Sequence, residues 1–364
     1  MSADAAEVVA APGVRPDGAR SARAVRLTAV FSGLVVALVV LTIVSIGLGQ
    51  LSMPPDQVLA SLLHRIGLWG PSGLTQTQED ALWIIRLPRV VLAIAVGAAL
   101  ATGGALMQGI FGNPLAEPGV IGVSAGAAVG ACAVIVLGLG FLGEWTVVAV
   151  AFAGAIAATA IAYSTARQGG RTEVVTLILT GVAVNAVCGA AIALLTFLGD
   201  TSSREEIVFW QLGSLNGTRW QHVLTVGPVV VVGIAVSLFA ARPLDLIALG
   251  DRPARHLGVD VERLRRRIVA LVAILTGAAV AFCGIIAFVG LVVPHLLRMV
   301  IGPGHRALIP GSALGGGVLL LAADLGARTI VPYADLPIGM LTAPVGGPFF
   351  LYLIRRSRRA GGWV

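Results

Sequence analysis

The sequence contains no lysine, and all of its 25 basic residues are arginine. A nucleotide-binding loop of the Walker type places a lysine on the phosphates, so this chain is not its own conventional ATPase. It has 3 cysteines, none of them in a Cys-x-x-Cys pair, and 5 histidines scattered along the chain. No group of these residues has the spacing of a zinc site. We therefore predict no metal centre, no bound cofactor and no catalytic cluster in this chain.

Charge is also scarce, since only 12% of the residues are charged and 57% are hydrophobic. A soluble domain seldom has so few charges, so most of the chain is expected to lie in lipid. The net charge of +7 would favour nucleic acid as the partner of a soluble protein. Here the arginines flank apolar runs, and membrane topology explains them better than a nucleic-acid surface does.

The fold class that follows is an all-α polytopic membrane protein with about ten transmembrane helices. Apolar runs of about one membrane thickness recur along the chain. The stretch 268–301 is short for two full crossings of about 20 residues each, so one of its two spans is predicted to be shortened. The predicted spans are 27–49, 88–110, 119–140, 146–166, 174–198, 223–241, 268–285, 287–301, 308–331 and 337–354.

Outside this ten-helix domain, 27–356, we predict a disordered N-terminal tail, 1–26, and a short C-terminal tail, 357–364. Segments predicted to face the cytoplasm hold 19 arginines and the opposite segments hold 6. This asymmetry is the one that the positive-inside rule expects. It predicts a multi-pass protein of the bacterial cytoplasmic (inner) membrane with both termini in the cytoplasm.

A weak internal repeat occurs at an offset of 180 residues, where GAALATGG at 97–104 aligns with GAAVAFCG at 277–284. The same offset places Pro114 over Pro294 and Gly122 over Gly302. In the ten-span topology these segments run in opposite directions. The pattern predicts an inverted repeat relating helices 2–5 to helices 7–10, as in many transporters.

Few residues within the spans can carry chemistry, because a charge there costs about 2.5–3.5 kcal/mol. Asp324 is the clearest case, and Arg328 four residues later can neutralise it on the same helix. A proton-coupled carrier usually lines its path with several such groups, so their scarcity counts against one. Gly122, Gly126 and Gly130 are spaced by four residues, and close helix packing is the favoured interpretation.

The segment 242–268 is too long and too amphipathic for a simple turn between spans. Gly250 and Gly258 bracket a predicted short helix that carries both charged and apolar side chains. A basic amphipathic segment can lie on lipid headgroups. The carboxylates among the arginines favour a protein partner over the lipid surface, although both interpretations stay open.

Six motifs of the chain resemble those of a known family. The chain resembles the FecCD-type permeases, the membrane subunits of ABC importers for ferric siderophores, haem or cobalamin, over about residues 30–356. The matching motifs are RLPR at 86–89, GALMQGIFGNPLAEPGVIGVSAGA at 104–127, LILTGVAV at 177–184, ALGDRPARHLGV at 248–259, IAFVGLVVPHLLR at 286–298 and ADLPIGMLTAPVGGPFFLYLIRR at 334–356.

The resemblance implies ten helices per subunit and a dimer around a central path, with either a second copy or a sister permease as the other half. It implies a separate ABC ATP-binding subunit, which carries ATP and magnesium, and a periplasmic or lipid-anchored substrate-binding protein. The positions that match the family's binding-protein docking residues are Arg86, Arg89 and Arg328. Those that match its cytoplasmic gate are Asn113, Leu115 and Leu179. The positions that match the family's contact segment for the ATP-binding subunit are Leu249, Gly250, Asp251, Ala254, Arg255, Leu257 and Gly258.

The expected function is therefore that of the permease subunit of a binding-protein-dependent importer, with ferric siderophores as the leading substrate and cobalamin or haem as alternatives. Two other classes stay open. A secondary, ion-coupled transporter would need no protein at the 242–268 segment. A membrane scaffold or receptor would transport nothing.

Overall fold

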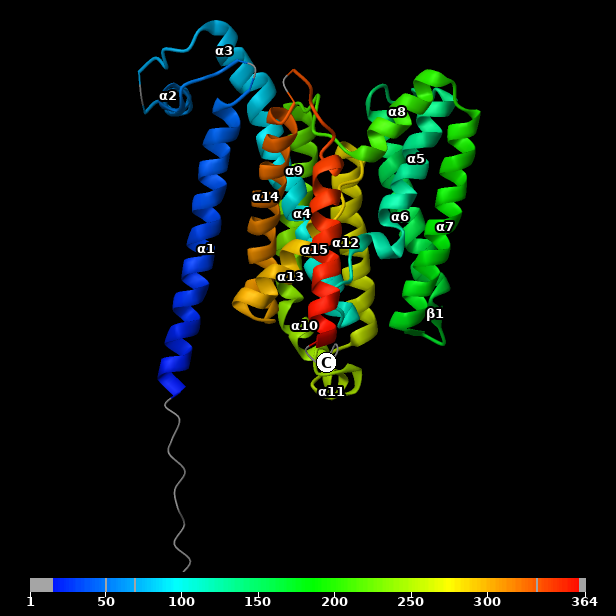
Figure 1. The fold of residues 1–364 in the computed structure, drawn as a ribbon. Helices are drawn as coiled ribbons and strands as arrows, with labels where there is room; N and C mark the ends of the chain where they lie inside the picture. Colours follow the sequence, from blue (N-terminus) through cyan, green and yellow to red (C-terminus); the bar gives the residue numbers. More distant parts are fainter. Residues whose placement is uncertain (1–15, 50, 69, 332, 360–364) are drawn as a thin grey trace, which may run out of the picture.

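The protein is a bundle of long helices in a computed structural model that describes residues 16–49, 51–68, 70–331 and 333–359 (Figure 1). Seven of the described helices are long and apolar enough to cross a membrane, and two shorter apolar helices lie among them. The fold class predicted from the sequence is therefore confirmed.

Each predicted span coincides with a helix, and shorter elements connect the spans. In chain order the elements are α1 (Pro16–Gly47), α2 (Pro55–Arg65), α3 (Gln76–Asp80), η1 (Ala81–Arg86), α4 (Leu87–Phe111), η2 (Pro118–Ile121), α5 (Val123–Leu137), α6 (Trp145–Thr165), β1 (Arg167–Gln168), β2 (Arg171–Thr172), α7 (Val174–Leu198), α8 (Thr201–Leu212), α9 (Trp220–Phe239), α10 (Ala241–Ile247), α11 (Asp251–His256), α12 (Val261–Cys283), α13 (Val289–Ile301), α14 (His305–Thr329) and α15 (Gly339–Arg359).

Helix α4 forms the core of the bundle, and most of its residues are buried. It is apolar on all sides, as expected of a helix surrounded by other helices. Glycine allows the closest contacts. A Cβ on Gly97 would lie 2.2 Å from the carbonyl oxygen of Gly316 on α14, and one on Gly104 would lie 1.7 Å from that of Gly290 on α13. These contacts bring the backbones together, which is how helices associate where no hydrophobic effect drives them.

Two of the predicted spans are short. Helix α13, at 13 residues, is the shortened span that the length of 268–301 predicted. Helix α5 is shortened to 15 residues, which the sequence analysis did not predict. Gly122 ends η2 with φ +86°, so it lies outside α5 and does not share a helix face with the other two glycines. Gly126 and Gly130 do face one way, each against a carbonyl of α6.

Three differences from the sequence analysis concern helix limits. Residues 16–26 form the first turns of α1 rather than a disordered tail, since alanine and arginine favour helix; residues 1–15 lie outside the described residues. Helix α15 runs to Arg359, so the C-terminal tail prediction falls partly on this helix and partly on residues outside the description. The polar stretch before 88–110 is helical from Gln76, because Thr75 and Gln78 form a capping box.

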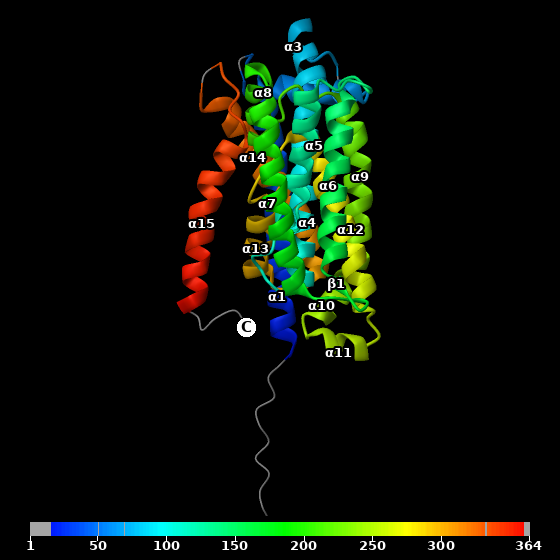
Figure 2. The same ribbon diagram turned by 90° about the vertical axis from the view of Figure 1, so that its right-hand side faces the viewer.

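The bundle has two distinct ends, named here the α3 end and the α11 end. The start of α1 and the end of α15 lie toward the α11 end, together with the β1–β2 hairpin, whereas α2, α3 and α8 cover the opposite end (Figures 1 and 2). Among the described residues, the two groups of arginines separated by the predicted topology thus lie at opposite ends. Which end faces the cytoplasm stays a prediction.

Helices α4 and α12 run in opposite directions between these ends, as an inverted repeat requires (Figure 1). The aligned prolines, however, occupy different places: Pro114 lies in the turn after α4, and Pro294 lies inside α13. The proline register therefore does not support the repeat, which stays a prediction.

Candidate functional site

At the α3 end, a buried ion-pair cluster joins α4 to α14. Arg89 donates from Nε to Asp324 at 2.9 Å and from Nη1 to Asp335 at 2.7 Å. Arg328 donates from Nε to the other oxygen of Asp324 at 3.1 Å, which confirms the predicted pair on α14. Asp324 is completely buried. One carboxylate therefore pairs with two arginines from two helices, and Asp335 supplies the second negative charge.

Two arginines at this end, Arg328 and Arg86, also hold the end of α1. Arg328 donates from Nη2 to the hydroxyl of Ser45 at 2.6 Å and to its carbonyl at 3.2 Å. Arg86 donates to the carbonyls of Ile46, Gly47 and Leu51. The last turn of a helix leaves carbonyls without intrahelical partners, and arginine supplies the donors here.

The three arginines predicted to dock a binding protein are thus close together but engaged inside the chain. Arg86 and Arg89 are 8% and 7% exposed. Asp335, whose side chain is 33% exposed, is the accessible partner in the cluster. An incoming carboxylate would reach Arg89 by taking the place of Asp335.

At the α11 end, the segment 242–268 folds as α10, α11 and the first two turns of α12. Helix α11 occupies the place predicted for a short helix, between Gly250 with φ +106° and Gly258 with φ +86°. Both values lie in the region that favours glycine, which turns the chain sharply on each side of α11. The turns place α11 at the extreme end of the bundle (Figure 1).

The side chains predicted to contact a partner divide into two groups. Leu249 and Leu257 are 64% and 59% exposed, and Arg255 is also exposed. Ala254 is fully buried against Ile247 and Val261. It therefore supports α11 from within, and it cannot itself touch a partner in this arrangement.

Asp251 also turns inward. Its carboxylate accepts from Nη2 of Arg265 on α12 at 2.9 Å. Its neighbours Arg252 and Arg255 remain exposed beside it. A polar cavity of about 390 Å³ separates this part of α11 from the β1–β2 hairpin.

A second contact holds α10 on α14. Asp245 accepts from the backbone N–H of His305 at 2.9 Å, and its Oδ1 lies 2.7 Å from Nδ1 of the same residue. His305 is the first residue of α14, where a helix has N–H groups without intrahelical partners. The imidazole of His305 packs against Gly109 of α4, where a Cβ would lie 2.7 Å from Nε2 of His305. The helix before α11 is therefore bound directly to the helix that carries Asp324.

The predicted gate residues lie on two elements that touch. Asn113 accepts from the N–H of Leu115 at 2.9 Å, which shapes the turn after α4. The following residues contact α7, since Asn185 donates to the carbonyl of Gly119 at 3.1 Å. Leu179 lies on α7 with its side chain 62% exposed. The turn and α7 are thus brought together at Gly119, while the side chain of Leu179 faces outward.

Glu117 in the same turn is half-buried, and burial raises the pKa of its carboxyl above the ordinary value. It lies between η2 and the end of α4, outside the helices that cross the membrane. Its charge is therefore unfavourable in the folded protein.

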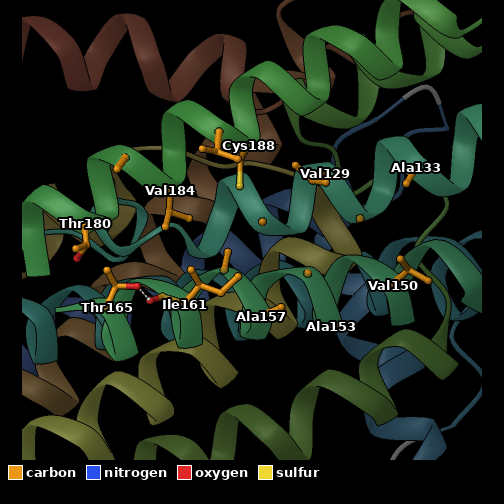
Figure 3. Close-up of a pocket in the computed structure, with 16 residues that line it drawn as sticks. Val129, Ala133, Val150, Ala153, Ala157, Ile161, Thr165, Thr180, Val184 and Cys188 are labelled. Carbon is orange, nitrogen blue, oxygen red and sulfur yellow. Dashed lines mark hydrogen bonds between the residues drawn. The ribbon is translucent and has the colours of Figure 1, made fainter. Parts of the chain in front are cut away.

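An apolar groove of about 730 Å³ runs between α5, α6 and α7, with Thr180, Val184 and Cys188 of α7 facing the other two helices (Figure 3). Its hydroxyls are already bonded: Thr180 donates to Ala162, and Thr165 to Ile161. A molecule in this groove would meet apolar surface without directional hydrogen bonds, so the groove by itself selects no ligand.

Several residues of these sites were not found from the sequence. They are Asp335, Ser45, Asp245, His305 and Arg265. For Asp245 and Asp335 the available signal was a carboxylate at a predicted helix end. For Arg265 there was none, because it lies in a run of similar arginines.

The comparisons with known proteins agree on one family. The model of the FecCD transport family matches residues 37–356. The hemin transport system permease protein HmuU of Yersinia pestis is 43% identical over 332 residues, covering 89% of this chain and 95% of the relative. The cobalamin import system permease protein BtuC of Halobacterium salinarum is 47% identical over 286 residues, covering 78% of this chain and 75% of the relative.

Among solved structures, one described as an inward-facing conformation of a metal-chelate type ABC transporter has a TM-score of 0.79. It is 30% identical and covers 90% of this chain and 99% of that chain. The likeness thus extends over most of the chain.

Proposed function

The chain belongs to the FecCD transport family, and we propose that it imports a metal-chelating macrocycle, haem or a corrinoid, as the permease subunit of an ABC importer. Two relatives of this chain, at 43% and 47% identity, are named for hemin and cobalamin. These names favour the alternative substrates of the sequence analysis over ferric siderophores. Haem is the first choice, because the hemin permease matches almost from end to end.

The observation that carries the proposal is that α11 has an exposed surface and is also anchored to the bundle. Leu249, Leu257 and Arg255 point away from the bundle, while Ala254 and Asp251 fasten the same helix to it. Exposed leucines at the end of a membrane protein are costly unless a partner covers them. We assign this surface to the ATP-binding subunit, which would supply ATP and magnesium, and this assignment makes the α11 end cytoplasmic.

The α3 end would then receive the substrate-binding protein. Arg86, Arg89 and Arg328 form the positive base of this face, with Asp335 as the accessible counter-ion. A carboxylate of the binding protein would replace Asp335 on Arg89 at little electrostatic cost, because one ion pair is exchanged for another. Docking and the internal cluster are therefore compatible.

Helix α7 offers the surface for a second copy or a sister permease. Its most apolar stretch is only 11% buried inside this chain, although α7 carries the predicted gate residue Leu179. In a dimer, two such helices would line a path with few polar groups. A path of this kind binds a bulky substrate weakly and leaves selection to the binding protein.

The experiment is affinity purification of the tagged chain from its native membrane in mild detergent, followed by an ATPase assay. An ATP-binding subunit should co-purify, and Leu249→Asp with Leu257→Asp should release it. Leu137→Asp with Leu139→Asp, a pair of exposed leucines at the end of α5 and directly after it, should not. A chain that elutes alone with no ATPase activity, yet transports hemin in response to an ion gradient, would instead identify a secondary transporter.

A further inference from the structure

Arg265 differs from the arginines around it. The run from Arg263 to Arg267 has four arginines, of which Arg263, Arg266 and Arg267 are exposed. The side chain of Arg265 is 8% exposed, at the start of α12. Burying a guanidinium is unfavourable unless partners compensate it, so its contacts should have a purpose beyond solubility.

The partners of Arg265 come from three elements. Its Nη2 donates to Asp251 of α11 at 2.9 Å, and its Nη1 donates to the carbonyl of Thr172 in β2 at 3.1 Å. Nη1 also lies 3.7 Å from Glu262 of α12, and Glu262 in turn accepts from the N–H of Thr172 at 3.0 Å. Both backbone groups of Thr172 are thus held by one pair of side chains.

Thr172 is the point where the chain enters α7. It lies two residues before Val174, the first residue of that helix, and it is buried. The hairpin before it turns at Gly169 and Gly170, both with positive φ, as a two-residue turn of type I′ requires. The hydroxyl of Thr172 lies 3.3 Å from that of Tyr163 on α6. The start of α7 is therefore fixed in place by polar contacts.

Elsewhere α7 packs on α5, α6 and η2. Its most apolar stretch is mostly exposed, and the contacts with the turn after α4 occur at Gly181 and Asn185. Between α11 and the hairpin lies the polar cavity, with Glu173 and Thr176 on one side and Arg252 and Arg255 on the other. Because no apolar packing fills that space, the fork of Arg265 is the bridge between the two elements.

We propose that Arg265 is a positioning residue that transmits displacement of α11 to the start of α7. The inference rests on the proposed function, in which α11 contacts the ATP-binding subunit and α7 lines the path. A guanidinium suits the task, because its planar fork holds two acceptors in fixed directions, which an ammonium cannot do. When α11 moves, the hydrogen bond that its Asp251 accepts displaces Arg265. The hydrogen bond from Arg265 to the carbonyl of Thr172 then displaces the backbone that leads into α7.

The test uses the complete complex with its ATP-binding subunit, reconstituted in vesicles with its binding protein. The wild-type complex is first assayed with hemin, cyanocobalamin and a ferric siderophore, and the probe that it takes up is used throughout. Arg265→Ala should keep the ATP-binding subunit and hydrolyse ATP within about twofold of wild type. The amount taken up per ATP should fall at least tenfold, as expected when a fixed link between two elements is removed.

Three further variants separate transmission from folding. Arg267→Ala, the matched change at an exposed arginine two residues later, should leave uptake per ATP at the wild-type value. Arg265→Lys keeps the charge without the fork and should lie between wild type and alanine. Asp251→Ala should match Arg265→Ala, and the double variant should be no worse than either, because both changes break one link.

An assembled Arg265→Ala or Arg265→Lys complex with wild-type uptake per ATP would overturn the proposal. So would an equal loss in Arg267→Ala, or a double variant whose loss is the product of the two single losses. Failure of the proposed function is distinguished by the wild-type measurements alone. The wild-type chain would then bind no ATP-binding subunit or show no ATP-driven uptake of any probe.

Discussion

At the α3 end Arg86, Arg89 and Arg328 are turned into the protein and bonded there, whereas at the α11 end Arg252 and Arg255 are exposed beside the buried Arg265. The first arrangement ties α1, α4 and α14 together. The second leaves charged and leucine side chains exposed on and beside α11, a small helix that Asp251 and Ala254 anchor to the bundle. The difference teaches that arginine content alone does not locate a docking surface; the partners of each guanidinium do.

The difference also predicts opposite sensitivities. Removing a partner from a buried ion pair leaves an uncompensated charge and is strongly destabilising. Changing an exposed charge alters stability little but can abolish binding to another protein. Variants at the α3 end should therefore change stability, and variants on the surface of α11 should change coupling.

The largest effect on stability is expected for Asp324→Ala. The change leaves Arg89 and Arg328 without their shared buried carboxylate, and we expect a loss of about 3–5 kcal/mol. Thermal unfolding in detergent, followed by tryptophan fluorescence, measures it. The control is Glu144→Ala, which removes an exposed pair with Arg219 and should cost about 1 kcal/mol or less. Equal melting temperatures for the two variants would contradict the contrast.

A smaller loss is expected for Asp245→Ala at the α11 end. The variant removes the acceptor for the first N–H of α14 and a negative charge near its N-terminus, which together stabilise by about 1–2 kcal/mol. Hydrogen exchange should rise first in the amides at the start of α14. Asp245→Asn keeps an acceptor oxygen and should show about half of the effect. Unchanged exchange at these amides would show that the contact with His305 does not hold α14.

Almost no loss of stability is expected for Arg255→Glu. Arg255 is exposed, so its reversal should change the melting temperature by less than the Asp245 variants do, since exposed charges contribute about 0–1 kcal/mol. ATP-driven uptake should nevertheless be abolished if α11 contacts the ATP-binding subunit. Vesicle uptake and co-purification measure this. Normal uptake in a well-inserted variant would remove Arg255 from the contact surface.

The smallest effect is expected for Glu117→Gln, and its sign depends on pH. Because burial raises the pKa of Glu117 in the folded protein, the folded state favours the protonated form. The wild type is thus relatively more stable at low pH, and that advantage is lost as pH rises through the folded-state pKa. Glutamine should therefore raise the melting temperature at pH 7.5, and the gain should fade toward pH 4.5. A gain that is equal at both pH values would contradict this reading.

Much of the fold was predictable from the sequence, for a simple reason. A backbone in lipid must satisfy its hydrogen bonds within each span, so apolar runs of sufficient length become helices. The run that became α7 was predicted with the same limits that it has in the structure. Helix α11 was predictable too, because glycines at both ends mark turns that other residues rarely adopt.

The sites were less predictable, because they depend on which side chains from distant segments meet. The pair of Asp324 and Arg328 lies on one helix, so spacing alone predicted it. The addition of Arg89 and Asp335 required the distant helix α4, and the loop that follows α14, to pack against α14. Likewise, the sequence shows four similar arginines between 263 and 267, and only the placement of α11 and the hairpin distinguishes Arg265 from its neighbours.

The sequence by itself thus determined that the chain is a membrane bundle, where its helices run and where a short helix projects from one end. Local chemistry decides these features: length, hydropathy and glycine conformation. The tertiary structure alone decided which arginines are sealed within the protein and which remain free to meet a partner. Burial and pairing depend on residues that are far apart in the chain, and local sequence carries no record of them.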